Sequence, residues 1–330
     1  MKKVVAGAAL ALLLISGCSL FKADPQTAVN NAFGKLAEVK KMTSKLVLKG
    51  TIHAPEGQKP AKTDFTLEAS GKSDVSVQSA PKVDMSLKIS ASADEKSGSA
   101  ALVLRTLEKK LYLNMSDVAM AGEAGKSLKE NLVAFLNKWW TLPLSSDSSL
   151  GKLTDQQKQV QELFKKTKFF VNAGENGQDL INGISATKYR VDLDKVALRS
   201  FIVETARITE SPMTPADEKN LDESLKELEF SGAVSVGDDD NVHRVQGTVT
   251  VQPAAGPLST FDVDFSAWDF GTDVVVVVPE GAQEFNPITA LPLFGALSTL
   301  TTPAAADEEV TDDTKAPAAK AGKTPAPATK

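Results

Sequence analysis

Cysteine occurs once in this sequence, and its position indicates what chemistry its thiol can serve. Cys18 follows a start with two lysines, an apolar run over residues 4–15, and the small residues Ser16 and Gly17. The apolar run is too short to span a bilayer as a permanent helix and fits the three-part pattern of a signal peptide. Small residues leave the backbone open to a peptidase, and the thiol can take up a diacylglyceryl group. We therefore expect residues 1–17 to be a signal peptide cleaved between Gly17 and Cys18.

The five residues from Leu14 to Cys18 resemble the lipobox of bacterial lipoproteins, in which an aliphatic residue and two small ones precede a cysteine. The resemblance implies diacylglyceryl and palmitate chains on Cys18, and several chains on one residue anchor a protein stably. Residues 18–24 would form the lipidated tether. Ser19 is not the aspartate that retains lipoproteins in the inner membrane of some Gram-negative bacteria, so the cell membrane and the outer membrane both stay open. A signal peptide with an incidental cysteine is the alternative.

The two histidines are far apart in the sequence. His53 has the wrong parity for the apolar face of its expected strand, which directs it toward water. His243 lies beside the acidic run Asp238–Asp240. Two distant histidines without a supporting cluster make a poor transition-metal site, so we expect surface histidines and no bound metal.

Two loop motifs resemble ligand-binding loops but lack the required spacing. Three consecutive aspartates in Gly237–Asn241 suit calcium, yet the alternate-residue spacing and distal glutamate of a calcium loop are missing, which favours a solvated hairpin turn. Ala121–Ser127 resembles a phosphate loop, but Met120 stands where the first glycine belongs. The sequence has no GxSxG motif and singles out no carboxylate pair, so we expect no enzymatic activity and no cofactor.

Trp139 and Trp140 are adjacent, and in a strand their side chains would point to opposite faces. One interpretation places an aromatic ring at the mouth of an apolar cavity or against lipid headgroups. The other, which we favour, is core packing with one partly exposed ring.

Composition limits the class of protein. The 330 residues carry a formal net charge of −5, which argues against nucleic acid as a partner. A single cysteine permits no disulfide, so core packing must hold the body together. Phe285–Leu300 is apolar but interrupted by two prolines, and we interpret it as a buried segment or a lid. Residues 303–330 are rich in Ala, Pro, Lys and Thr, and we expect a disordered tail.

Alternating apolar and polar residues dominate the body, which predicts antiparallel strands with one solvated face. Val83, Met85, Leu87, Ile89 and Ala91 give the clearest example. Weaker alternations occur over residues 46–52, 65–69, 100–104, 111–115, 245–251 and 261–265, with a strand pair near 169–191 and an apolar run over 274–278.

Helical spacing occurs in five places. Val29, Ala32, Phe33 and Leu36 predict a first helix, and a stripe over residues 128–139 predicts a second. A third begins at Thr154 as its cap, a fourth spans 196–208, and a fifth over 221–228 is capped by Thr214. This order predicts an α+β fold with helices on one side of a large antiparallel sheet, in a single domain over residues 25–302.

The pattern resembles the LolA/LppX superfamily of bacterial envelope proteins over about residues 25–284. The segments that carry the resemblance are the opening helix leading into Lys45–Thr51, Leu111–Asn114, Lys138–Pro143, Gly183–Asp194 running into a helix, and a closing strand that ends at Pro279. The resemblance implies a curved antiparallel half-barrel with helices covering its concave face, which in several members holds a lipid. This chain is longer than typical carriers and adds a helical insertion around residues 214–228.

Two functions remain open. The first is a membrane-anchored extracytoplasmic lipoprotein that binds a lipid or other hydrophobic ligand in the half-barrel, with the membrane as partner through Cys18. The second is a structural or interaction module of the cell envelope with the same fold and no ligand. An apolar cavity of a few hundred cubic ångströms would favour the first function. The sequence assigns no ligand-binding residue, because such cavities are lined by generic apolar side chains.

Overall fold

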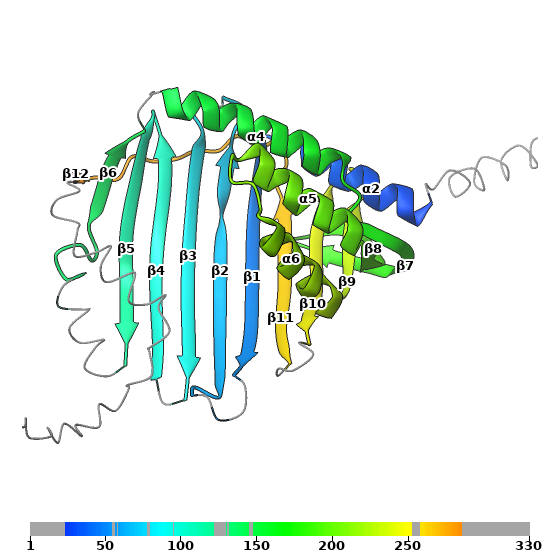
Figure 1. The fold of residues 1–330 in the computed structure, drawn as a ribbon. Coiled ribbons are helices and arrows are strands. Elements are labelled where there is room, and N and C mark those ends of the chain that lie inside the picture. Colours follow the sequence, from blue (N-terminus) through cyan, green and yellow to red (C-terminus); the bar gives the residue numbers. More distant parts are fainter. Residues whose placement is uncertain are drawn as a thin grey trace, which may run out of the picture.

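The computed structural model describes residues 24–285 except 55–56, 58, 78–79, 95, 122–129, 131, 145–147 and 253–257. For residues 148–154 it describes the backbone but not the side chains. The described strands form one sheet of twelve in the order β12-β6-β5-β4-β3-β2-β1-β11-β10-β9-β8-β7. All neighbours are antiparallel except β12 and β6. The sheet is open, with β12 and β7 at its edges (Figure 1). The predicted α+β half-barrel fold is therefore confirmed.

The strands are β1 (Lys41–His53), β2 (Lys62–Asp74), β3 (Lys82–Ala93), β4 (Lys96–Leu107), β5 (Lys110–Met120), β6 (Trp139–Pro143), β7 (Phe170–Ile181), β8 (Ile184–Leu193), β9 (Leu228–Gly237), β10 (Val242–Val251), β11 (Ser259–Trp268) and β12 (Gln283–Glu284). The helices are α2 (Pro25–Leu36), α4 (Ser148–Lys166), α5 (Lys195–Ile208) and α6 (Pro215–Glu227). The long meander β1–β5 comes from the alternating segments, as predicted.

Side-chain caps define where three of the helices begin. The carboxylate of Asp24 accepts hydrogen bonds from two backbone N–H groups of α2, and Asp194 does the same for α5. Thr214 and Asp217 form a reciprocal capping box at α6, with Pro215 in its first turn. The predicted cap at Thr214 is confirmed.

Helix α2 covers the core at one end of the sheet. Its buried Val29 and Ala32 belong to a cluster with residues of β7–β10, among them Val234, which is fully buried. The amide of Gln26 fixes the helix to β7, donating to the carbonyl of Phe170 at 2.8 Å. Helix α6 contacts β10, while α4 contacts α2 and α5. Figure 1 shows α5 and α6 in front of the β9–β11 region, whereas most of the length of β1–β5 has no described helix in front of it.

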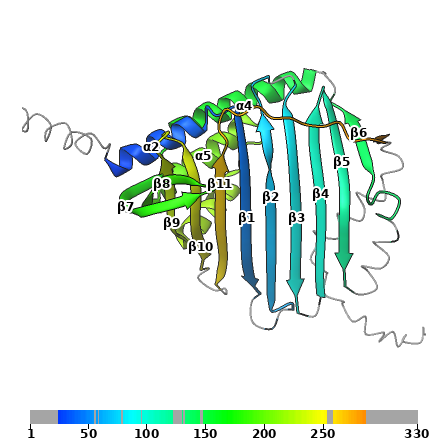
Figure 2. The same ribbon diagram turned by 180° about the vertical axis from the view of Figure 1, so that it is seen from behind.

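After β11 the chain crosses the opposite face of the sheet as an extended strap, residues 269–285 (Figure 2). Lys41 on β1 binds Asp273 at 2.5 Å, and Arg105 on β4 donates to the carbonyl of Val277. Val274 and Val276 are buried while Val275 is 78% exposed. The expected strand over residues 274–278 is therefore wrong: these valines alternate because the strap has a buried and an exposed side, and they join no ladder among the described strands.

Two helix predictions need correction. The expected helix over 128–139 does not continue past residue 132: residues 130 and 132 are helical, residues 133–135 are a turn and Trp139 already belongs to β6, while 128, 129 and 131 lie outside the described residues. Leu132 is buried and Leu136 is partly buried against β4 and β5, which explains their apolar spacing without a continuous helix. Helix α4 begins at Ser148, so Thr154 lies within the helix and is not its cap.

Candidate functional site

The strand register aligns apolar residues of different strands into continuous rows on the face that bears α2. We call this side the inner face. One row joins Val249, Phe261, Gly50, Phe65, Ala91 and Gly98; the next joins Gly247, Val263, Leu48, Leu67, Ile89, Ala100 and Val118. Because a strand's side chains alternate between faces, a shift of one residue would turn each row to the other side. The alternating segments of the sequence thus form one surface.

Glycines in these rows make room for aromatic rings. A Cβ at Gly50 would lie 2.3 Å from the ring of Phe65 and 2.8 Å from that of Phe261, so both rings extend over the glycine. The two ring centroids are 5.9 Å apart. Phe230 occupies the same kind of position over Gly232 and Gly247. A glycine in a strand interior allows this close approach. As a result, aromatic rings lie close to the backbone on the inner face.

The two halves of the inner face differ in how far they are covered. Under α2, Val234 is fully buried, whereas on β3 Ile89 is 46% exposed. Leu48, Phe65 and Leu67 are partly exposed, and Ala91 is exposed. We call these five residues of β1–β3 the open apolar face. On β4 and β5 the inner face is instead covered by Leu132 and Leu136.

Charge is nearly absent from the inner face of the meander. Among the inner positions of β1–β5, the described residues include one charged side chain, Lys96, which is the first residue of β4. An apolar surface without nearby charges suits a hydrocarbon chain, because no ion has to be desolvated when the surface is covered.

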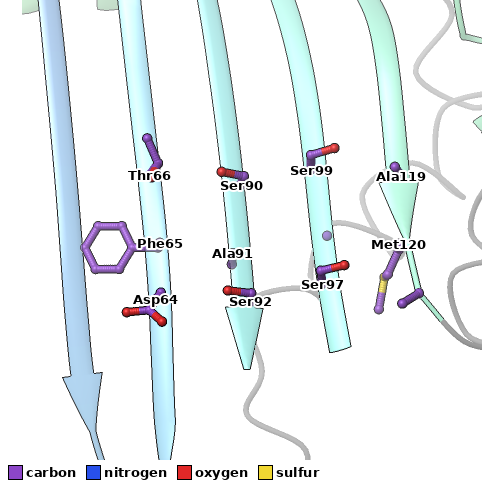
Figure 3. Close-up of a pocket in the computed structure, with 12 residues that line it drawn as sticks. Asp64, Phe65, Thr66, Ser90, Ala91, Ser92, Ser97, Ser99, Ala119 and Met120 are labelled. Carbon is purple, nitrogen blue, oxygen red and sulfur yellow. The ribbon is translucent and has the colours of Figure 1, made fainter. Parts of the chain in front are cut away.

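A hollow of about 520 Å³ lies at one end of β2–β5 (Figure 3). Six of its twelve lining residues are polar, namely Asp64, Thr66, Ser90, Ser92, Ser97 and Ser99, and the other six, which include Phe65, Ala91 and Met120, are apolar or glycine. Hydrogen bonds from Thr51 and Lys62 hold the pKa of Asp64 below its usual range. The hollow is open and its lining is mixed, unlike the enclosed cavity of Val, Leu, Met and Phe that would favour a lipid carrier.

The structure places the two histidines differently. His53 at the end of β1 is exposed, as predicted. His243 is only 1% exposed, so the expectation of a surface histidine is wrong. A β-bulge between Val242 and Arg244 interrupts the regular alternation of side chains, and the His243 ring lies in the interior of the protein. There its nitrogens lie 3.0 Å from the Ala267 carbonyl and 3.0 Å from the Asp239 carboxylate.

The aspartates of the acidic run lie in the turn between β9 and β10, as predicted. Asp238, Asp239 and Asp240 are all exposed. Burial opposes the ionisation of Asp239, but hydrogen bonds from Asn241 and His243 outweigh it and hold its pKa below the usual value. In the part of the chain that the structure describes, no group of three His, Cys, Asp or Glu side chains could hold a metal ion.

The two tryptophans do point to opposite faces. Trp140 pairs with Leu113 on the inner side, and its ring packs 5.2 Å from Phe135 and 6.2 Å from Phe285. Trp139 lies on the outer side, with the Arg105 guanidinium 4.9 Å from its ring centroid. Both rings are partly exposed, and each has a packing role.

Several predicted features lie outside the described residues: the signal peptide, the cleavage residues Gly17 and Cys18, the loop residues 122–127, and the chain after Phe285, including the expected tail over 303–330. Among the described helices, none is long and apolar enough to cross a bilayer.

Comparison with solved structures returns distant similarities. LprF from Mycobacterium bovis shares 12% identity and a TM-score of 0.38, covering 78% of this chain and 98% of that one. The Mycobacterium tuberculosis lipoprotein LppX shares 9% identity and a TM-score of 0.32, covering 77% and 100%. The MucA/MucB complex of Pseudomonas aeruginosa shares 12% identity and a TM-score of 0.22, covering 78% and 68%.

No family model and no curated sequence matches the chain. At TM-scores below 0.5 these similarities carry no argument about function, which has to come from the geometry of the chain itself.

Proposed function

We propose that this chain is an extracytoplasmic lipoprotein, anchored to a bacterial membrane through Cys18, whose body binds the hydrocarbon chain of a lipid on the open apolar face. The observation that carries the proposal is the contrast within one sheet. The inner face is buried under α2 but leaves Ile89 46% exposed on β3. Contiguous apolar surface of this kind on a soluble domain marks an interaction site.

The proposed binding is non-covalent and hydrophobic. Burying a methylene is worth about 0.8 kcal/mol, so eight methylenes laid on the face would contribute roughly 6 kcal/mol. Association costs at least about 4 kcal/mol of lost translational and rotational freedom. The balance supports a weak, reversible complex, and further contacts would have to supply any tighter affinity. Because the two rings over Gly50 are uncharged, affinity should depend on the length of the hydrocarbon chain more than on the identity of the headgroup.

Titration of the chain, from Cys18 to Lys330 with Cys18→Ser, with a fluorescent fatty acid tests this proposal. Ile89→Asp places a carboxylate in the centre of the open apolar face, and we expect at least a tenfold loss of affinity, because covering an ion costs more than 1.4 kcal/mol. Val275→Asp on the strap is the matched control, since Val275 is more exposed and lies on the other face. Its affinity should stay unchanged.

Circular dichroism shows whether each variant folds, and Ile89→Ser supplies a milder change if the aspartate does not. Equal affinities for Ile89→Asp and Val275→Asp would show that the fatty acid binds elsewhere.

The alternative is an envelope module that binds no lipid. It is favoured by the packing of Leu132 and Leu136 on β4 and β5, and by the open shape and mixed lining of the hollow in Figure 3. The same titration decides between the two, because a module without a ligand would not take up the fatty acid in any variant.

A further inference from the structure

The described chain ends at the edge of the sheet beside β6. The strap crosses the outer face of the sheet and reaches its edge at β12, which pairs with β6. There the backbone N–H of Phe285 donates to the carbonyl of Thr141 at 2.9 Å. The ring of Phe285 then packs edge-on against Trp140, which belongs to the inner face. The described chain therefore crosses the outer face and ends along the edge of the sheet, with the ring of its last residue on the inner side.

The sequence that follows matches the open apolar face in chemistry. Residues 286–300 read NPITALPLFGALSTL, and no charged residue occurs between Glu284 and Asp307. The described inner face of β1–β5 also carries no charged side chain except Lys96, the first residue of β4. When an apolar segment contacts an apolar face of the same chain, both surfaces are removed from water, which is favourable.

The distance is within reach of this segment. Five strand spacings of about 4.8 Å separate β6 from β1, which is roughly 24 Å. Fifteen residues span up to about 50 Å when extended. Ile89 on β3 lies only three spacings from β6, so even a compact segment starting at Phe285 reaches it.

We propose that, in the absence of lipid, residues 286–300 bind the open apolar face of β1–β3, and that a lipid chain must displace them. The first half of this proposal depends only on the described face and on where the chain leaves it. The second half rests on the proposed lipid-binding function. A second copy of the chain is the competing occupant, and the test separates it from the segment.

The first experiment places a photo-crosslinking amino acid at Ile89 in the same chain from Cys18 to Lys330, with Cys18→Ser and without lipid, and maps the crosslinked peptides by mass spectrometry. We expect intramolecular crosslinks to residues 286–300, and none from the same probe at Val275. Crosslinks between two chains would overturn the proposal in favour of self-association. Crosslinks confined to residues 24–285 of the same chain would also overturn it. This readout needs no lipid, so it stands even if the proposed function fails.

The second experiment puts charge into the segment with the double variant Leu291→Asp, Leu293→Asp. Crosslinking from Ile89 should fall, and fatty-acid affinity should rise about tenfold if the segment occupies the face nine-tenths of the time. Deletion of residues 303–330 is the control, which should change neither. A double variant whose crosslinking and affinity both match the parent would contradict the proposal.

Discussion

Gly71 on β2 offers a sharp test of the sheet geometry. A Cβ at this position would lie 2.2 Å from the carbonyl oxygen of Asp84 and 2.7 Å from the Cα of Met85. Both atoms belong to the backbone of β3, so no side-chain rotation relieves the clash. Gly98 on β4 is the matched control, because its added Cβ would meet the Ala119 carbonyl oxygen at 3.5 Å and the Met120 Cγ at 3.9 Å, which are both ordinary contacts.

The expected magnitudes follow from these distances. Replacing a strand glycine by alanine stabilises by about 0.5–1 kcal/mol when the site has room. Forcing a methyl group into occupied space costs about 1–3 kcal/mol. We therefore expect Gly98→Ala to be neutral or slightly stabilising, and Gly71→Ala to be less stable than Gly98→Ala by about 1–3 kcal/mol.

Urea denaturation followed by circular dichroism measures this difference, and thermal unfolding should show a gap of roughly 3–10 °C. If Gly71→Ala proves as stable as Gly98→Ala, β2 and β3 do not approach as closely as described, and the inner-face rows lose their registration at that point.

Three further predictions concern other parts of the molecule. Cys18→Ser in cells should abolish labelling by radiolabelled fatty acid and release the chain from membranes; persistence of both would contradict lipidation at this residue. Asp194→Ala should destabilise the fold by about 0.5–2 kcal/mol in denaturant titrations by leaving two N–H groups of α5 without their cap, whereas Asp194→Asn should retain most of the stability. Folding lowers the pKa of Asp239, so its carboxylate adds to the free energy of unfolding at pH values above its pKa in the unfolded chain. This contribution is lost as the pH falls through the lower pKa of the folded chain. The free energy of unfolding, measured from pH 6 to pH 2, should therefore fall less steeply for Asp239→Asn than for the parent.

The alternating strands could be predicted because one face of each is solvated. The alternation of residue types from Val83 to Ala91 predicts a strand, and the register places Ile89 and Ala91 in the inner-face rows. Period-two spacing carries no information on what covers the face, however. The difference between buried Val234 and half-exposed Ile89 depends on where α2 packs, and only the structure reveals it.

Other features were missed for identifiable physical reasons. The five valines over 274–278 have strong strand propensity, but propensity does not say whether a ladder partner exists. His243 stands next to a polar turn and could not be expected inside, since a one-residue bulge decides its direction. The rings of Phe65 and Phe261 extend over Gly50 from the two neighbouring strands, and this contact can be recognised only once the register is known.

The central claim is that hydrocarbon chains bind the open apolar face. A fatty acid with a photoreactive diazirine near its terminus, added to the chain from Cys18 to Lys330 with Cys18→Ser and activated by light, tests it directly when labelled peptides are mapped by mass spectrometry. The account predicts saturable labelling of peptides that contain Leu48, Leu67 or Ile89, competed by unlabelled fatty acid. Labelling confined to the strap valines or to exposed Leu180, or no saturable labelling at all, would contradict it.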